Sequence, residues 1–192
     1  MDKLRMETFS DAVLAILLTI LVLELSIPQT ADLNGLFQMK EQFLAYGISF
    51  FILATYWINH HHLLDLADKI NEQVIWANIL GLFSISLFPF VTAWFGKSDF
   101  NSLVPAMLYG IVFLTTNAAY AFLQYSLIKC NGESSKIYKT LSGDRRILIT
   151  FAISIISIFL AFISPILTPI TCFLITAMFV IPTKTIENFF KN

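Results

Sequence analysis

Few residues of this chain could do chemistry, and they cluster near long apolar segments. The three histidines of the chain are consecutive, His60, His61 and His62. Histidines that bind one metal ion on a helix are typically spaced i, i+4, whereas consecutive side chains point about 100° apart and cannot converge. We therefore prefer a structural cluster to a metal site here. An enzyme is not expected, because the chain has neither an H-E-x-x-H motif nor an activated nucleophile.

Polar residues also interrupt the first apolar segment, over residues 9–27, where Asp11, Thr19 and Glu24 lie. Acids in a membrane helix face protein or water rather than lipid. At about 100° per residue, one face of this helix presents five residues within roughly 60° of one another: Arg5, Ala12, Ile16, Thr19 and Leu23. Such a face could line a pore. Alternatively, the hydroxyl of Thr19 bonds only to its own helix.

The segments that must position these residues are membrane helices. Of the 192 residues, 57% are hydrophobic and 13% are charged, against roughly 45–50% and about 25% in soluble domains. The net charge of −1 gives no basic surface for nucleic acid. Uncharged runs predict an all-α integral membrane protein, a single domain over residues 1–192 with six transmembrane helices per subunit. The expected helices are about 5–27, 38–63, 73–95, 103–129, 146–164 and 168–188.

Prolines shape two of these segments. The uncharged run 147–183 is too long for one crossing, and Pro165 and Pro169 divide it. Because proline removes a backbone donor and disfavours a helical residue before it, we expect a hairpin of two short helices. Pro89 should kink helix 73–95.

The basic residues predict the orientation. If the N-terminus is cytoplasmic, ten of the twelve lie on the cytoplasmic side: Lys3, Arg5, Lys69, Lys129, Lys136, Lys139, Arg145, Arg146, Lys184 and Lys191. Only Lys40 and Lys97 lie outside. Positive charge favours the inside, so we expect a multi-pass protein of the cell membrane with both termini in the cytoplasm.

Several motifs resemble those of a known family. Residues 5–16, RMETFSDAVLAI, fit the R-x-x-x-F-S-D pattern on the first helix of the transmembrane-protein-175 family, which are bacterial and endolysosomal potassium channels. Residues 57–62, WINHHH, are similar to the family's tryptophan-to-histidine segment. Residues 76–80, WANIL, and 86–92, SLFPFVT, are similar to its W-x-N-x-L and S-L-x-P-F-x-T stretches. The resemblance covers residues 5 to about 96, and helices 103–129, 146–164 and 168–188 match only in number and hydropathy.

The resemblance implies a homotetrameric potassium channel in which helix 5–27 of each subunit lines a central pore. It implies potassium passing in preference to sodium, no cofactor, and no TVGYG filter loop. The sequence agrees on the last point, because Tyr46-Gly47 and Tyr109-Gly110 follow Ala45 and Leu108. The partners expected are other copies of the chain, potassium ions and membrane lipid.

The site residues carry over by position. The family's pore constriction falls on Ile16, Thr19, Ile20 and Leu23. A hydrogen-bonded network that anchors the foot of the pore helix is expected from the following residues: Arg5, Phe9, Ser10, Asp11, His60, His61, Trp76 and Asn78. The pattern favours His60 or His61 for this network. Glu24 would lie at the outer mouth, or else is an ordinary interfacial carboxylate.

One further function remains open from the sequence. A proton-coupled secondary transporter could use Asp11 and a histidine as a proton relay. Against it, no helix carries a charged residue at mid-depth, and no pair of Gly/Pro-interrupted helices is evident.

Overall fold

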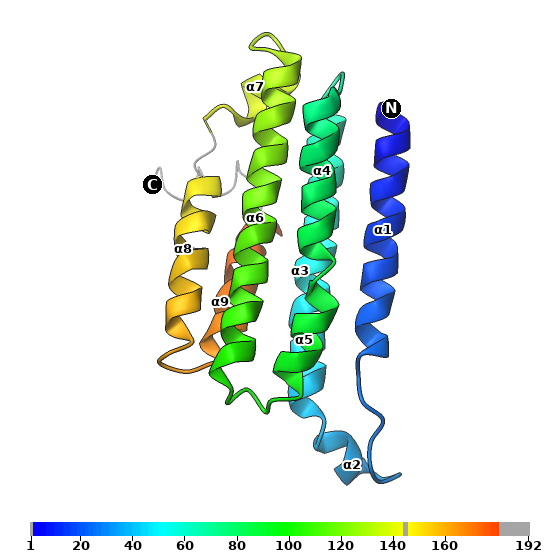
Figure 1. The fold of residues 1–192 in the computed structure, drawn as a ribbon, viewed down its shortest axis with the longest axis vertical. Helices are drawn as coiled ribbons and strands as arrows, with labels where there is room; N and C mark the ends of the chain where they lie inside the picture. Colours follow the sequence, from blue (N-terminus) through cyan, green and yellow to red (C-terminus); the bar gives the residue numbers. More distant parts are fainter. Residues whose placement is uncertain (1, 144–145, 181–192) are drawn as a thin grey trace.

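A computed structural model gives the fold of residues 2–143 and 146–180, and it is helical throughout this part of the chain. The long helices run side by side, with short helices at both ends of the bundle (Figure 1). In chain order the helices are α1 (Lys3–Leu23), α2 (Leu33–Phe37), α3 (Lys40–Asp65), α4 (Glu72–Ile85), α5 (Phe88–Gly96), α6 (Leu103–Asn131), α7 (Lys136–Leu141), α8 (Arg146–Leu160) and α9 (Leu167–Val180).

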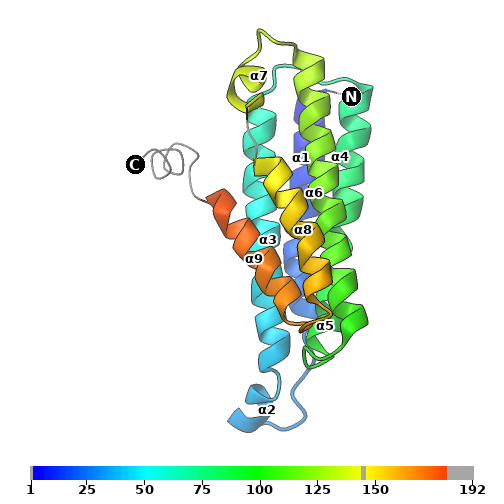
Figure 2. The same cartoon turned by 90° about the vertical axis from the view of Figure 1, so that its left-hand side faces the viewer.

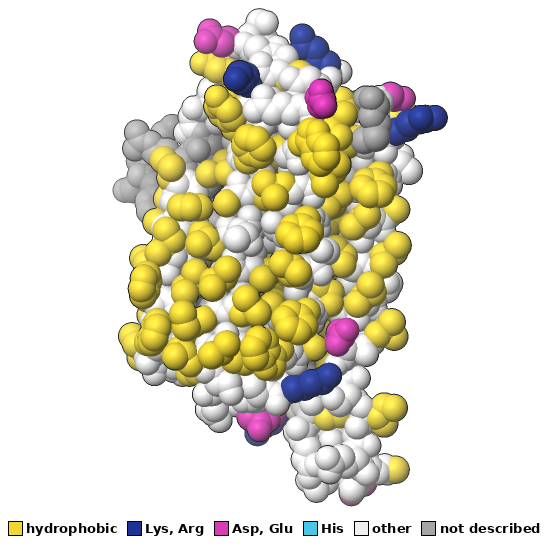
Figure 3. Space-filling view, in the orientation of Figure 1, with side chains coloured by type: hydrophobic (Ala, Val, Ile, Leu, Met, Phe, Trp, Pro, Cys, Tyr) yellow, Lys and Arg dark blue, Asp and Glu magenta, His cyan; other side chains and the backbone are white. Residues whose placement is uncertain are grey.

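Within the described residues, three helical segments are long and apolar enough to cross a membrane: α1, α4 with α5 taken together over Glu72–Gly96, and α6. The shorter helices α8 and α9 are also apolar, and α3 has 26 residues. On the face seen in Figure 3, hydrophobic side chains cover the middle of the molecule and charged side chains lie toward its two ends. This distribution is that of a multi-pass membrane protein, as the composition predicted.

The two proline expectations are confirmed. The segment 72–96 breaks between α4 and α5 at Ser86 and Leu87, and Pro89 is the second residue of α5. The chain turns between α8 and α9, and Pro165 lies in this turn. Figure 2 shows α8 and α9 as a hairpin beside α3 and α6.

Some predicted boundaries were wrong. The first helix ends at Leu23, not at residue 27, because the backbone N–H of Ser26 donates to Oε1 of Gln42 (3.0 Å) and no longer continues the helix. The last predicted helix reaches residue 188, and its part beyond Val180 lies outside the described residues. The short helices α2 and α7 were not predicted, since helices of five and six residues carry almost no periodic signal.

The interior holds two apolar clusters. The larger runs along the middle of the bundle and includes Leu14, Leu53, Phe88 and Tyr109. The smaller lies at the end that holds the N-terminus and includes Met6 and Leu127. Both clusters include residues of α1, so one face of this helix is packed along most of its length.

A close approach of helices at Gly110 secures the α8–α9 hairpin. A Cβ atom at this position would lie 2.8 Å from Cγ1 of Ile158 and 3.0 Å from Cγ2 of Thr168. Glycine therefore lets α6 approach both helices of the hairpin, the usual role of small residues between membrane helices.

Replacing Gly110 tests this packing. We expect Gly110→Ala to destabilise the protein by about 1–3 kcal/mol through overpacking, measured as a lower unfolding temperature in detergent. The matched control is Gly47→Ala on α3, where an added Cβ meets nothing within 4 Å. An equal effect of the two substitutions would contradict the proposed close approach.

Candidate pore helix and its anchoring network

The two faces of α1 differ in their surroundings. The packed face holds Met6, Ser10, Leu14, Leu17 and Leu21, all buried against the rest of the chain. The opposite face carries the predicted stripe, and it is open: Arg5, Ala12, Ile16, Thr19 and Leu23 are all exposed. Ile16 is 57% exposed and Leu23 is 78% exposed.

Ile20 is only half-buried and flanks the open stripe. Glu24 follows the last residue of α1 and lines a narrow crevice of about 10 Å³ together with Gln42 and Tyr46 of α3. Its carboxylate therefore lies toward α3 and α5, beside the stripe rather than on it.

The hydroxyl of Thr19 donates one hydrogen bond within its helix, and the residue is exposed. Its Oγ1 donates to the carbonyl oxygen of Ile16, one turn back, at 2.7 Å. A hydroxyl has one hydrogen and two lone pairs, so this bond leaves the lone pairs available on an exposed face. The hydroxyl of Thr19 thus bonds to its own helix, as the alternative from the sequence stated. Its Oγ1 can still accept a hydrogen bond from water or contact a cation.

A buried relay of hydrogen bonds ties α1 to α3 and α4. Nδ2 of Asn78 donates to Oγ of Ser10 (2.8 Å), and Oδ1 of Asn78 lies 2.7 Å from Nε2 of His60. Because an amide oxygen only accepts, His60 must carry its proton on Nε2. The hydroxyl of Ser10 in turn donates a hydrogen bond to the carbonyl oxygen of Met6 (2.8 Å). Each side chain of this Ser10–Asn78–His60 relay is satisfied, although all three are buried.

Asp11 is bonded to Trp57 and not to a histidine or Arg5 of the expected network. Its Oδ1 accepts from Nε1 of Trp57 on α3 at 2.9 Å. Trp57 was not among the residues expected in this network from the sequence. The available signal was its depth, since Trp57 and Asp11 both lie near the end of the bundle that holds the N-terminus, and an indole N–H in a membrane needs an acceptor.

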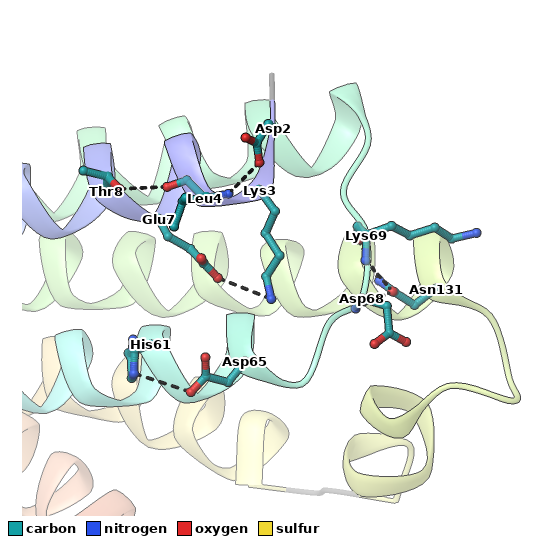
Figure 4. A network of polar contacts seen from close by, with 10 residues as sticks. All are labelled: Asp2, Lys3, Leu4, Glu7, Thr8, His61, Asp65, Asp68, Lys69 and Asn131. Atoms are coloured by element: carbon teal, nitrogen blue, oxygen red, sulfur yellow. Dashed lines mark hydrogen bonds and ion pairs between the residues drawn. The ribbon is translucent and has the colours of Figure 1, made fainter.

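Four residues expected in the network lie outside it. His61 pairs with Asp65 on the exposed side of α3, with Nε2 to Oδ2 at 3.4 Å (Figure 4). Trp76 is 63% exposed, and Phe9 and Arg5 face outward on α1. Within the described residues these last three have no hydrogen bond or ion pair from their side chains. Helix rotation explains this, because a one-residue step turns a side chain by about 100°.

His60 is the histidine of the network, and His62 is exposed. Asp11 and His60 are hydrogen-bonded to Trp57 and Asn78, not to one another, which does not favour the proton relay of a transporter. Among the described residues, no group of three His, Cys, Asp or Glu side chains could hold a metal ion.

A second buried chain of hydroxyls was missed from the sequence. Oγ1 of Thr92 on α5 donates to Oγ of Ser49 on α3 (2.7 Å), which is bonded to the hydroxyl of Tyr109 on α6 (2.8 Å). These hydroxyls join three helices at the other end of the large apolar cluster. At the end that holds the N-terminus, Asn131 closes the bundle by accepting from the backbone N–H groups of Asp68 and Lys69 (Figure 4).

Comparison with known proteins agrees with this arrangement. Residues 5–89 match the family model described as the endosomal/lysosomal potassium channel TMEM175. A potassium channel of Chryseobacterium sp. (strain P1-3) is 37% identical over 192 residues, which is the full length of both chains. The chain belongs to the TMEM175 family of potassium channels. The family resemblance seen in the motifs is confirmed.

Other TMEM175 relatives support the same assignment. A potassium channel of Streptomyces collinus is 28% identical over 132 residues, 65% of this chain and 64% of that protein. The crystal structure of a lysosomal potassium-selective channel TMEM175 homologue from Chamaesiphon minutus superposes with a TM-score of 0.80 at 26% identity, covering 93% of this chain and 96% of that chain. Members of this family are channels, not enzymes, and potassium is their permeant ion.

Removing Asn78 tests the relay. Asn78→Ala leaves His60 and Ser10 without their partner in a buried site, so we expect a loss of about 1–3 kcal/mol in stability, measured by thermal unfolding in detergent. The control is Ser84→Ala, a buried hydroxyl on α4 that bonds only within its own helix, to Leu80. The relay would be unimportant if Asn78→Ala unfolded at the same temperature as Ser84→Ala.

Proposed function

We propose that this protein is a potassium-selective channel of the cell membrane, a homotetramer in which four copies of α1 surround the pore. The observation that carries this proposal is the difference between the buried and the exposed face of α1. One face is packed and hydrogen-bonded to its own subunit, and the other presents an apolar stripe with the Thr19 hydroxyl in it. A charge-poor stripe interrupted by one exposed hydroxyl fits a narrow pore better than a lipid contact.

A shared pore follows from how one subunit is filled. Apolar side chains such as Leu53, Phe88 and Phe95 pack the centre of the bundle, and this leaves no room there for a row of hydrated ions. Several subunits must therefore contribute to one path. The Chamaesiphon minutus protein of similar fold is named a potassium-selective channel, and this supports the same activity here.

The proposed constriction consists of Ile16, Thr19, Ile20 and Leu23. Rings of Ile16 and Leu23 would exclude water when narrow and so gate the pore. Four Thr19 oxygens between these rings would replace part of the hydration shell of the ion. Potassium gives up water at lower cost than sodium, so weak coordination in an apolar constriction already favours potassium, without a TVGYG filter.

The acids and bases have supporting roles in this proposal. Four Glu24 carboxylates near the outer end of α1 would raise the local cation concentration, because a ring of charge acts beyond its own contacts. The Ser10–Asn78–His60 relay and the Asp11–Trp57 bond would hold the foot of α1 while the constriction opens and closes.

Both termini are proposed to be cytoplasmic. The N-terminus, the α3–α4 connection and α7 share one end of the bundle (Figure 1), and the bases Lys3, Lys69 and Lys136 belong to these segments. Positive residues favour the cytoplasmic side. Arg145, Lys184 and Lys191, which enter the same argument, lie outside the described residues.

Thr19 provides the test of selectivity. We expect Thr19→Ala to reduce the potassium-to-sodium permeability ratio several-fold, by about 1 kcal/mol of lost coordination, measured from reversal potentials with the protein in liposomes or planar bilayers. Thr115→Ala is the matched control, because the hydroxyl of Thr115 also donates to a carbonyl oxygen three residues earlier, that of Val112 on α6.

The apolar rings provide a test of the constriction. Ile16→Asn and Leu23→Asn should raise conductance, because a polar side chain lets water enter the constriction. Unchanged selectivity in Thr19→Ala and unchanged conductance in these two variants would place the filter elsewhere.

Cross-linking provides the test of the tetramer. In a background with Cys130→Ser and Cys172→Ser, Leu23→Cys should form disulfides between subunits under mild oxidation, because Cα atoms around a narrow pore come within about 7 Å. Leu17→Cys faces into its own subunit and should not form them. Native mass spectrometry should give four chains. A monomer, or equal cross-linking of the two variants, would refute the central position of α1.

A further inference from the structure

A cavity with both polar and apolar lining residues lies between α3, α6 and α9, on the side of α3 away from α1. Its volume is about 50 Å³, and it is partly open. The polar residues that line it are Thr55, Tyr56, Asn59, Thr116, Asn117, Tyr120 and Thr176. Such a concentration of hydroxyl and amide groups in a membrane bundle is costly unless something binds them.

Thr116 is the clearest sign of a missing partner. Its side chain is only 4% exposed, and its Oγ1 has no hydrogen-bond partner among the described residues. Buried polar groups are normally satisfied, and an exception at a cavity wall suggests a bound group.

Thr176 and Asn117, which line the same cavity, each have an oxygen that can accept a hydrogen bond. The hydroxyl of Thr176 gives its hydrogen to the carbonyl oxygen of Cys172 (2.8 Å) and keeps its lone pairs. Nδ2 of Asn117 donates to the carbonyl oxygen of Phe113 (2.9 Å), and no described residue donates to its Oδ1. The wall can thus both donate to and accept from a hydroxyl group.

The remaining wall defines the class of ligand. The lining is completed by Ile52, Phe113, Ile175 and Phe179, and none of the lining residues in the described part of the chain is charged. A space of this size has room for roughly four water molecules, and each would need two to four polar partners. The hydroxyls of Thr176 and Tyr120 and Nδ2 of Asn117 already donate to backbone carbonyl oxygens, so few polar groups of the wall remain for a cluster of waters. A neutral molecule with one hydroxyl and an apolar chain satisfies the polar and the apolar parts of the wall together.

Tyr56 connects this cavity to the pore helix. Its ring lines the cavity and stacks on His60 at 5.9 Å between centroids, and it meets Tyr120 edge-on at 5.7 Å. Its hydroxyl reaches α4, where a Cβ at Gly81 would lie 2.8 Å away. His60 belongs to the relay that reaches Ser10 on α1. The Tyr56 ring therefore contacts both the cavity and a member of the relay that holds α1.

We propose that the α3–α6–α9 cavity binds the hydroxyl end of a neutral amphiphile from the bilayer, and that its occupancy alters channel opening through Tyr56 and the Ser10–Asn78–His60 relay. The site itself is independent of conduction. The effect on opening rests on the proposed channel function.

Photolabelling tests the site. The full chain in phosphatidylcholine nanodiscs is labelled with 1-octanol that carries a diazirine on its chain, and separately with the corresponding octane, and labelled peptides are mapped by mass spectrometry. We expect the alcohol to label segments 52–59, 113–120 and 175–179 at least about fivefold more than the hydrocarbon. Thr116→Val should reduce this labelling about fivefold, the equivalent of one hydrogen bond.

The matched control is Ser126→Ala. Ser126 is a second buried hydroxyl on α6 without a partner among the described residues, and it does not line the cavity. Both substitutions remove an unpaired hydroxyl, so both variants should fold. Labelling that is absent, equal for alcohol and hydrocarbon, or unchanged by Thr116→Val would overturn the site and leave water as the occupant.

Single-channel recording tests the coupling. Unmodified 1-octanol should change the open probability of the wild-type channel at least about fivefold, in the usual range of coupling between sites, and Thr116→Val should abolish this change while Ser126→Ala keeps it. Since octanol also alters the bilayer, an equal response of all three proteins would overturn the coupling. A protein that is labelled but never conducts would refute the proposed function and leave the binding site standing.

Discussion

Polar groups inside a bilayer must find their partners within the protein, and the Ser10–Asn78–His60 relay satisfies this constraint for three helices at once. It needs α1, α3 and α4 at one relative depth and rotation. An error of one residue in α4 breaks both bonds, and an error in α1 or α3 breaks the bond that this helix makes to Asn78. The apolar packing of Met6 and Leu14 holds the same face of α1. Hydrogen bonding and packing therefore agree on which side of α1 faces inward.

The open face of α1 is a direct consequence of that rotation. Because one face of α1 packs against the other helices of the chain, Ile16, Thr19 and Leu23 all lie on the exposed face. A pore built from such faces belongs to the interface between subunits rather than to any one of them. Its geometry would depend on the rotation of α1, which the relay sets from a distance of several turns.

The helix α3 has a central position in this arrangement. Trp57 donates to Asp11 on α1, and His60 is bonded to Asn78 on α4. Thr55 and Asn59 line the cavity beside α6 and α9. Tyr56 contacts both regions through its ring. The proposed ligand on one side of α3 and the proposed pore helix on the other would share a few adjacent residues of α3, so their coupling would need no long pathway.

The sequence by itself determined three kinds of feature. The cost of charge in lipid gives the apolar segments, the missing backbone donor of proline gives the break near Pro89 and the turn between α8 and α9, and the helical period gives the stripe of α1. Each depends on residue type and helical period alone. The tertiary structure decided which side chains meet, namely that His60 and not His61 binds Asn78, that Trp57 binds Asp11, and that Thr116 has no partner. These outcomes depend on the relative rotation and depth of helices far apart in the sequence, and packing of the whole bundle sets both.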